Sequence, residues 1–119
     1  MDSVRFDRTA RLTNGSAFRY VFQKPIRSSD ACLTILSRTN NQDHARLGLA
    51  LARKHVHRAV ARNRLKRLIR EYFRLHCAQL PNVDLVVLAK PGVGRRSNDE
   101  LRASLGRHWK RLSNSCGRC

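Results

Sequence analysis

The chain has 119 residues, enough for one domain with a single core and too few for two. Its 25 Lys and Arg residues against 8 Asp and Glu residues give a net charge of +17, which favours a polyanionic partner: RNA, DNA or, as the weakest alternative, an anionic membrane. No apolar run approaches the roughly 18 to 20 residues that cross a bilayer, and no secretion signal opens the chain, so we expect a cytosolic protein.

The first segment predicts a basic arm followed by a short helix. Residues 1–12 carry three arginines among small and polar residues, so we expect an extended arm that becomes ordered against a partner. The segment 13–16 supplies N-cap residues, and apolar side chains follow at helical spacing. Because Pro25 cannot continue a helix, this helix should end near Gln23.

Phe18 and Phe22 are four residues apart and should lie one above the other on this helix. Aromatic side chains in a small domain usually pack in the core, so a core pair is the default interpretation. The alternative is a surface on which unpaired bases stack. The residues alone favour the core.

Two segments after the first helix have the composition of strands. Residues 31–37 are mostly apolar, 38–44 form a polar turn region, and 46–52 alternate leucine with small residues. We expect the two strands to form a hairpin, and a further short strand near 27–31. The small residues of 46–52 should face a close neighbour, either a helix or a nucleotide backbone.

The segment 56–77 is a long amphipathic helix by its periodicity. At 100° per residue, an apolar arc that includes Leu65, Ile69 and Phe73 separates from a polar arc on the opposite side. The polar arc is built from Asn63, Lys66, Arg67, Arg70 and Arg74. One side of the helix should therefore enter the core, and the other should face anions.

The basic arc has two interpretations. Charged helical surfaces are most often simply solvated, but those surfaces normally mix both signs. Here Glu71 is the only acid between residues 53 and 74, so we favour binding of phosphate, which arginine can grip with two parallel hydrogen bonds. The amide of Asn63 can both donate and accept, which suits an RNA surface.

The remaining elements are a strand and a third helix. The apolar run 83–89 predicts a central strand, and the glycines of the loop 90–96 lack the spacing of a phosphate-binding loop. Ser97 and Glu100 form a capping box that starts a helix with an apolar stripe. The polar residues from Ser113 onward predict a flexible tail, 113–119.

The order of elements predicts an α+β fold, a two-layer α/β sandwich with three helices on one sheet. Residues 13–112 should form the single domain between the arm and the tail. If the strands flanking the long helix are parallel, the default connection between them is right-handed.

The chain lacks a constellation for catalysis. Its eight acids are scattered over predicted loops, caps and surfaces, and no pair suits catalytic metal ions, so we expect no bound metal or other cofactor. Cys116 and Cys119 have C-x-x-C spacing but no second ligand pair, and without secretory context reduced thiols are the default for all four cysteines.

One run carries a specific resemblance. The sequence RNRLKRLIREYFR at 62–74, preceded by RLGL at 46–49 and ARK at 52–54, closely resembles the bacterial ribonuclease P protein subunit. The Arg-Asn-Arg start of the helix is the signature of that family. The agreement extends over roughly residues 11–112 and includes AKPG at 89–92.

The resemblance implies a fold and a function. It implies a mixed sheet and a left-handed strand–helix–strand crossover, and we adopt that hand in place of the default. It also implies that the protein joins a large catalytic RNA, which holds the magnesium ions, and assists cleavage of the 5′ leader from precursor tRNA. The implied partners are these two RNAs, with no DNA and no membrane.

The resemblance also implies site residues. The basic helix should face the catalytic RNA, and a cleft between the first helix and the sheet should receive the single-stranded leader. The helix residues are Arg62, Asn63, Arg64, Lys66, Arg67, Arg70 and Arg74. The cleft residues are Phe18, Phe22, Ile35, Arg46, Arg53 and Lys54, and Arg11 is a further basic position.

Two departures from the family pattern affect the cleft. Arg53 and Lys54 stand where the family commonly has two lysines, which preserves charge but changes geometry. The strand around Ile35 carries no aromatic residue. Two rival functions also stay open. One is a different RNA-binding module, such as a ribosome-associated protein, and the other is a self-sufficient nuclease, against which the scattered acids argue.

Overall fold

The computed structural model describes residues 15–40, 44–80 and 82–116, with side chains to residue 113. The predicted arm, including Arg11, lies outside these residues, as do positions 117–119. The elements in chain order are α1 (Gly15–Gln23), β1 (Ile26–Ser29), β2 (Leu33–Thr39), β3 (Arg46–Ala50), α2 (Ala59–His76), β4 (Val83–Ala89) and α3 (Asn98–Cys116). Two short 3-10 helices, η3 (Cys77–Gln79) and η4 (Val93–Arg95), flank β4.

The four strands form one mixed sheet in the order β1-β2-β4-β3. β2 is antiparallel to both β1 and β4, whereas β3 and β4 are parallel. The predicted α+β class, with a mixed sheet and three helices, is confirmed. The left-handed connection from β3 through α2 to β4 stays an expectation from the family resemblance.

The predicted hairpin between residues 31–37 and 46–52 is wrong, because β4 lies between β2 and β3. A turn of polar residues indicated that the chain reverses, but it does not determine which strands pair. β4 is the most apolar strand and is buried along nearly its whole length, so it takes a central place. The hairpin of the structure joins β1 to β2.

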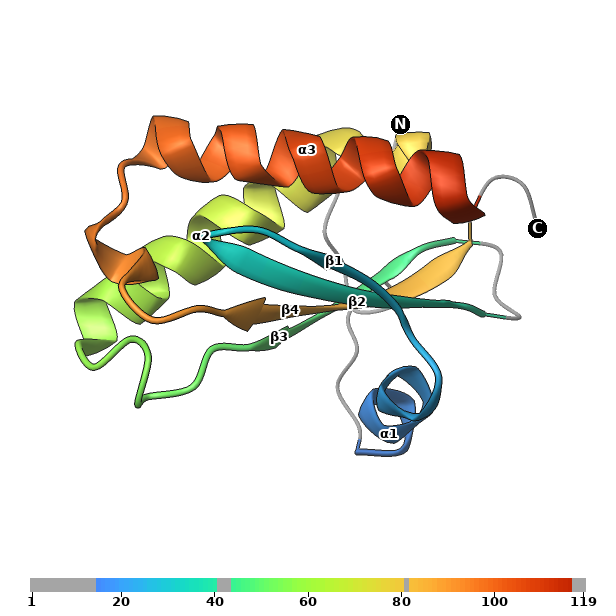
Figure 1. Ribbon diagram of the computed structural model, residues 1–119, viewed down its shortest axis with the longest axis horizontal. Coiled ribbons are helices and arrows are strands. Elements are labelled where there is room, and N and C mark those ends of the chain that lie inside the picture. The colour runs from blue at the N-terminus through green and yellow to red at the C-terminus, as the bar shows by residue number, and fades with distance from the viewer. Residues whose placement is uncertain (1–14, 41–43, 81, 117–119) are drawn as a thin grey trace.

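The two faces of the sheet are covered unequally. In Figure 1, α2 and α3 lie over one face and the short α1 lies against the other. The main core lies under α2 and α3, where Leu65, Ile69 and Phe73 of α2 meet Leu101 and Leu105 of α3 and the alternate residues of the strands. On the α1 face, the described residues form a smaller cluster around Val21, Leu36 and Val86.

The capping box of α3 is present as predicted. The Ser97 hydroxyl accepts a hydrogen bond from the Glu100 amide (3.1 Å), and the Glu100 carboxylate accepts one from the Ser97 amide (3.0 Å). The tail predicted from Ser113 begins too early, because α3 continues to Cys116. Leu112 is 1% exposed and the Ser113 hydroxyl donates to the Gln79 carbonyl, so tertiary contacts hold the last turns in place despite their polar composition.

Candidate nucleic-acid interface

The exposed side of α2 carries a continuous set of basic side chains. We call the residues Asn63, Lys66, Arg67, Arg70 and Arg74 the basic face of α2. They line a shallow hollow of about 360 Å³ together with Glu71. Within the described part of the chain, the side chains of Asn63, Lys66 and Arg67 make no hydrogen bond or ion pair with the protein, so their polar groups are available to an external partner.

One acid, Glu71, lies beside the basic face of α2. Glu71 accepts a hydrogen bond from Arg74 three residues on, and both side chains are partly open to solvent. An exposed pair of this kind contributes little stability, roughly 0–1 kcal/mol. An anion that approaches the helix can therefore disrupt this ion pair at small cost.

The two signature arginines have internal roles. Arg62 donates from Nη1 to the carbonyls of Val56 and His57, both at 2.9 Å. These bonds fix the loop that leads into α2, where the N-cap position, Arg58, makes no side-chain capping bond. Arg62 thus satisfies carbonyl groups of the preceding loop, and only its remaining donors can reach a ligand.

Arg64 links α2 to the loop before α3. It donates from Nη1 to the Asn98 amide oxygen at 2.6 Å and from Nη2 to the carbonyls of Gly94 and Arg96, each at 3.1 Å. Gly92, with φ of +83°, makes the turn that brings this loop back toward α2. The guanidinium therefore crosslinks two helices through neutral acceptors and keeps its positive charge uncompensated.

α1 carries the aromatic pair predicted from the sequence. Phe18 is half-buried and packs against the small cluster on this face of the sheet, whereas Phe22 is 47% exposed. The two interpretations thus divide between the residues: Phe18 has a packing role, and Phe22 offers an open ring. The cleft that the resemblance implies beside them stays a prediction.

Ile35 does not face this side of the sheet. It is fully buried in the main core, opposite Val87, beneath the α2 and α3 layer. Because side chains alternate along a strand, Thr34 and Leu36 are the β2 residues that face α1. The prediction that Ile35 lines a leader cleft is therefore wrong. The sequence did not show whether the odd-numbered or the even-numbered residues of β2 face α1.

Arg46 is on the α1 face, but a carboxylate already holds it. Its Nε and Nη2 donate to the two oxygens of Asp84 at 2.9 and 2.7 Å, and the Asn40 amide donates to the same carboxylate at 2.7 Å. The hydrogen bond with Asp84 raises the pKa of Arg46. Asp84 is only 1% exposed, so this pair contributes no net charge for a ligand.

Arg53 and Lys54 are different. Both are exposed in the turn between β3 and α2, and the structure gives neither an ion pair within the described residues. They are therefore the candidate leader-binding cations whose charge is uncompensated. The sequence did not distinguish them from Arg46, because the partner of Arg46 lies 38 positions along the chain.

A contact between Tyr20 and Arg38 was not predicted. The Arg38 guanidinium lies 3.9 Å from the centre of the Tyr20 ring and donates to the Tyr20 carbonyl at 2.8 Å. The Tyr20 hydroxyl in turn donates to the Thr39 carbonyl at 2.6 Å. These contacts hold α1 against β2, and no local sequence pattern signals them.

A buried polar cluster joins α3 to the β1–β2 turn. Asp30 accepts from Ser104, from Arg107 and from the amides of Cys32 and Leu33. Burial alone would raise the pKa of Asp30, but these hydrogen bonds outweigh it and hold the pKa well below its usual range. The cluster tethers α3 to the sheet.

His108 is fully buried beside Asp30. Its Nδ1 shares a 2.6 Å hydrogen bond with the Ser28 hydroxyl, and its Nε2 lies 3.4 Å from the Asp30 carboxylate. Burial lowers the pKa of His108, against the opposing attraction of Asp30. The neutral imidazole is thus the favoured form, and both Ser28 (5% exposed) and His108 (0%) are closed off from solvent.

The described residues contain no group of three or more His, Cys, Asp or Glu side chains that could hold a metal ion. Cys32 is buried and Cys77 half-buried, both as free thiols. The side chains of Cys116 and Cys119 lie outside the described part. None of the described helices has the length and hydropathy that a membrane span requires.

Comparisons with known proteins give one consistent family. The family model described as Ribonuclease P matches residues 6–113. The ribonuclease P protein component of Histophilus somni and that of Proteus mirabilis are each 49% identical over 111 residues, which is 93% of this chain and 93% of either relative. The solved RNase P protein of Thermotoga maritima is 30% identical with a TM-score of 0.76, over 86% of this chain and 96% of that one.

Proposed function

Because the chain belongs to the ribonuclease P protein family, in which it has the role of the protein subunit, we propose that it binds the catalytic RNA of that ribonucleoprotein through the basic face of α2. The observation that carries the proposal is the contrast within this helix. Leu65, Ile69 and Phe73 are buried, whereas Lys66 and Arg67 on the other side have no protein partner among the described residues. A helix that is fixed along one side and carries unpaired cations such as Lys66 and Arg67 along the other presents charges from a rigid support to a phosphate backbone.

The second RNA that we propose the protein contacts is the substrate, precursor tRNA, through its 5′ leader. Phe22 supplies an exposed aromatic ring on α1, and Arg53 and Lys54 supply unpaired charge after β3. Such a combination suits a single strand, because bases stack on aromatic rings while cations follow the backbone. Arg46 acts here by positioning Asp84 and Asn40 rather than by neutralising a phosphate.

In this proposal the RNA performs the bond cleavage and holds the Mg²⁺ ions, and the protein acts through binding. A chain of +17 reduces the repulsion between the catalytic RNA and its polyanionic substrate, so less magnesium is needed. The partners are RNA alone, without DNA or membrane, and the place of action is the cytosol.

The test is reconstitution with a bacterial ribonuclease P RNA and a precursor tRNA. The protein should accelerate leader removal at low magnesium, and the double reversal Arg67→Glu with Arg70→Glu should weaken assembly, because two cations on the basic face become acids. Lys110→Glu, an exposed reversal on α3, is the charge-matched control for Arg67→Glu alone and should leave assembly nearly unchanged. Circular dichroism should show all variants folded.

Two outcomes would contradict the proposal. Unchanged low-magnesium cleavage by the Arg67/Arg70 double variant would remove the basic face of α2 from the interface. RNA binding by the wild-type protein without faster cleavage would favour a general RNA-binding module instead.

A further inference from the structure

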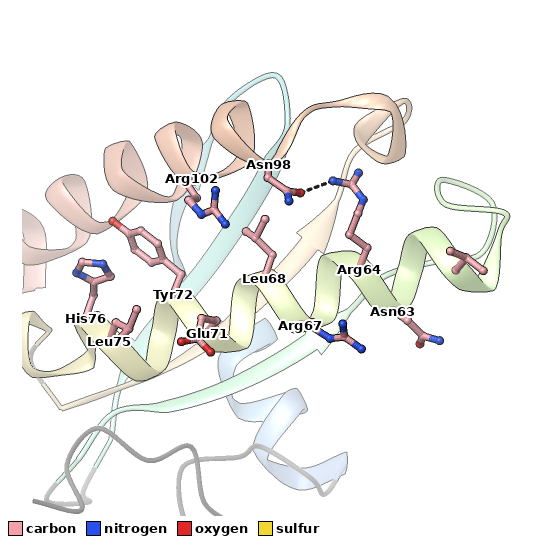
Figure 2. Close-up of a pocket in the computed structure, with 11 residues that line it drawn as sticks. Asn63, Arg64, Arg67, Leu68, Glu71, Tyr72, Leu75, His76, Asn98 and Arg102 are labelled. Atoms are coloured by element: carbon pink, nitrogen blue, oxygen red, sulfur yellow. Dashed lines mark hydrogen bonds between the residues drawn. The ribbon is translucent and has the colours of Figure 1, made fainter.

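A groove of about 610 Å³ separates α2 from α3, on the side of α2 next to its basic face. Figure 2 shows Leu68 and Tyr72 rising from α2 toward α3, and Arg102 descending from α3 toward them. Val60 and Leu75, two of the lining residues, are 80% and 54% exposed. The groove is thus an open apolar surface on a very basic protein.

The aromatic part of the groove is rigid. The Tyr72 ring stacks on His76 with centroids 4.1 Å apart, and it meets Trp109 edge-on at 5.0 Å. Trp109 is itself fixed, because its indole N–H donates to the His76 carbonyl at 3.0 Å. A planar ligand that packs here would find side chains that need little further ordering.

The polar residues of the groove are suited to a nucleotide. Arg64, Arg67 and Arg102 contribute three positive charges against the single carboxylate of Glu71. Asn63 adds an amide that can both donate to and accept from the edge of a base, and Asn98, whose oxygen accepts from Arg64, adds an N–H donor. Arg102 is only weakly held, by a 3.5 Å contact with the exposed Asp99, so it can turn toward a phosphate.

The groove is continuous with the basic face of α2. Asn63, Arg67 and Glu71 line both the groove and the shallow hollow of that face. RNA that lies along the basic face therefore passes the open side of the groove. A duplex cannot insert a base there, whereas an unpaired nucleotide can leave the stack and enter.

We propose that this groove binds one unpaired nucleotide of the RNA partner, with its base against Tyr72 and Leu75 and its phosphate between Arg67 and Arg102. The proposal rests on the proposed function, because the RNA must first lie on the basic face of α2. Charge favours this occupant over an apolar peptide helix, which would leave three arginines beside its own nonpolar surface.

The first test compares two exposed cations of α3. Arg102→Gln removes a cation that lines the groove, whereas Lys110→Gln removes one outside it. With a transcript of a bacterial ribonuclease P RNA as the probe, Arg102→Gln should weaken binding by about three- to tenfold and Lys110→Gln by less than about twofold. Equal effects of the two substitutions would overturn the proposal.

The second test locates the nucleotide. A photoreactive benzoylphenylalanine at Leu75, which is exposed, should crosslink to one or two adjacent unpaired nucleotides of the transcript, and Arg102→Gln should reduce the crosslink by about the same factor as the binding. Crosslinks spread over paired helices, or RNA binding with no crosslink, would overturn the groove proposal alone. Failure of the wild-type protein to bind the transcript at all would overturn the proposed function as well.

Discussion

The two sides of α2, a helix of eighteen residues, have different roles. The apolar side meets α3 and the sheet, and every large side chain on it has protein neighbours. The basic face has few internal partners, and its like charges repel one another. We therefore expect the apolar side to determine the stability of the fold and the basic face to determine the affinity of the protein for RNA. Arg64 lies at the boundary between the two sides.

The largest effect should come from the buried side. Phe73 is 1% exposed and packs edge-on against Trp109 at 6.3 Å. Phe73→Ala should lower the free energy of unfolding in urea by about 3–5 kcal/mol, because it leaves a cavity in the main core. Phe73→Leu, which retains most of the volume, should cost clearly less, and a loss under about 1 kcal/mol for the alanine variant would show that this side is not the core.

Arg64 should give an intermediate effect. Arg64→Ala removes the hydrogen bonds to Asn98 and to the carbonyls of Gly94 and Arg96, and should lower the free energy of unfolding by about 1–3 kcal/mol. Arg67→Ala, three residues on, is the matched control and should change it by less than about 0.5 kcal/mol. If both variants unfold at the same urea concentration, Arg64 belongs with the binding residues.

A buried group outside α2, the cluster between α3 and the β1–β2 turn, should make the stability of the fold depend on pH. The pKa of His108 is lowered in the folded protein, so the unfolded chain takes up a proton first as the pH falls through about 6.5. The pKa of Asp30 is lowered too, so its contribution is present above about pH 4 and is lost in stronger acid. The free energy of unfolding should therefore fall in both ranges.

His108→Gln isolates the first of these two losses. Urea titrations between pH 7 and pH 5 should show a smaller fall in stability for this variant than for the wild type. His57→Gln, an exposed histidine outside the cluster, is the matched control. An identical pH dependence for His108→Gln and the wild type would exclude the buried cluster as the origin of the effect.

The smallest effect on stability should accompany a clear effect on binding. Lys66→Gln should leave the free energy of unfolding within about 0.5 kcal/mol of the wild type. If Lys66 contacts one phosphate, the slope of the logarithm of RNA affinity against the logarithm of salt concentration should fall by about 0.7 to 0.9. A lower stability with an unchanged salt slope would reverse the assignment of the two sides.

Local patterns in the sequence predicted much of this arrangement. The periodicity of residues 56–77 separated both sides of α2, the apolar run predicted β4 with its bounds, and the Ser97 capping box located the start of α3. These features succeed because each is determined within a few residues along the chain.

The misassigned residues share a dependence on distant partners. The burial of Ile35 depends on whether the odd-numbered residues of β2 face α2. Whether the charge of Arg46 is compensated depends on Asp84 in another strand. Arg64 likewise finds its acceptors 30 to 34 positions away. No local pattern carries such information, so the sequence identified which residues are basic but not which of them are free.

The strand order has a consequence for how the polypeptide acquires its shape during synthesis. β2 and β4, the inner pair of the sheet, join residues as far apart as Leu33 and Ala89. Until the ribosome has released the chain through position 89, β2 has only the four-residue β1 beside it, and a two-stranded ribbon is marginal in water. A pause in translation within α2 would thus leave a highly cationic, incompletely folded chain that can bind nucleic acids nonspecifically. Rapid synthesis of β4 shortens the lifetime of that intermediate.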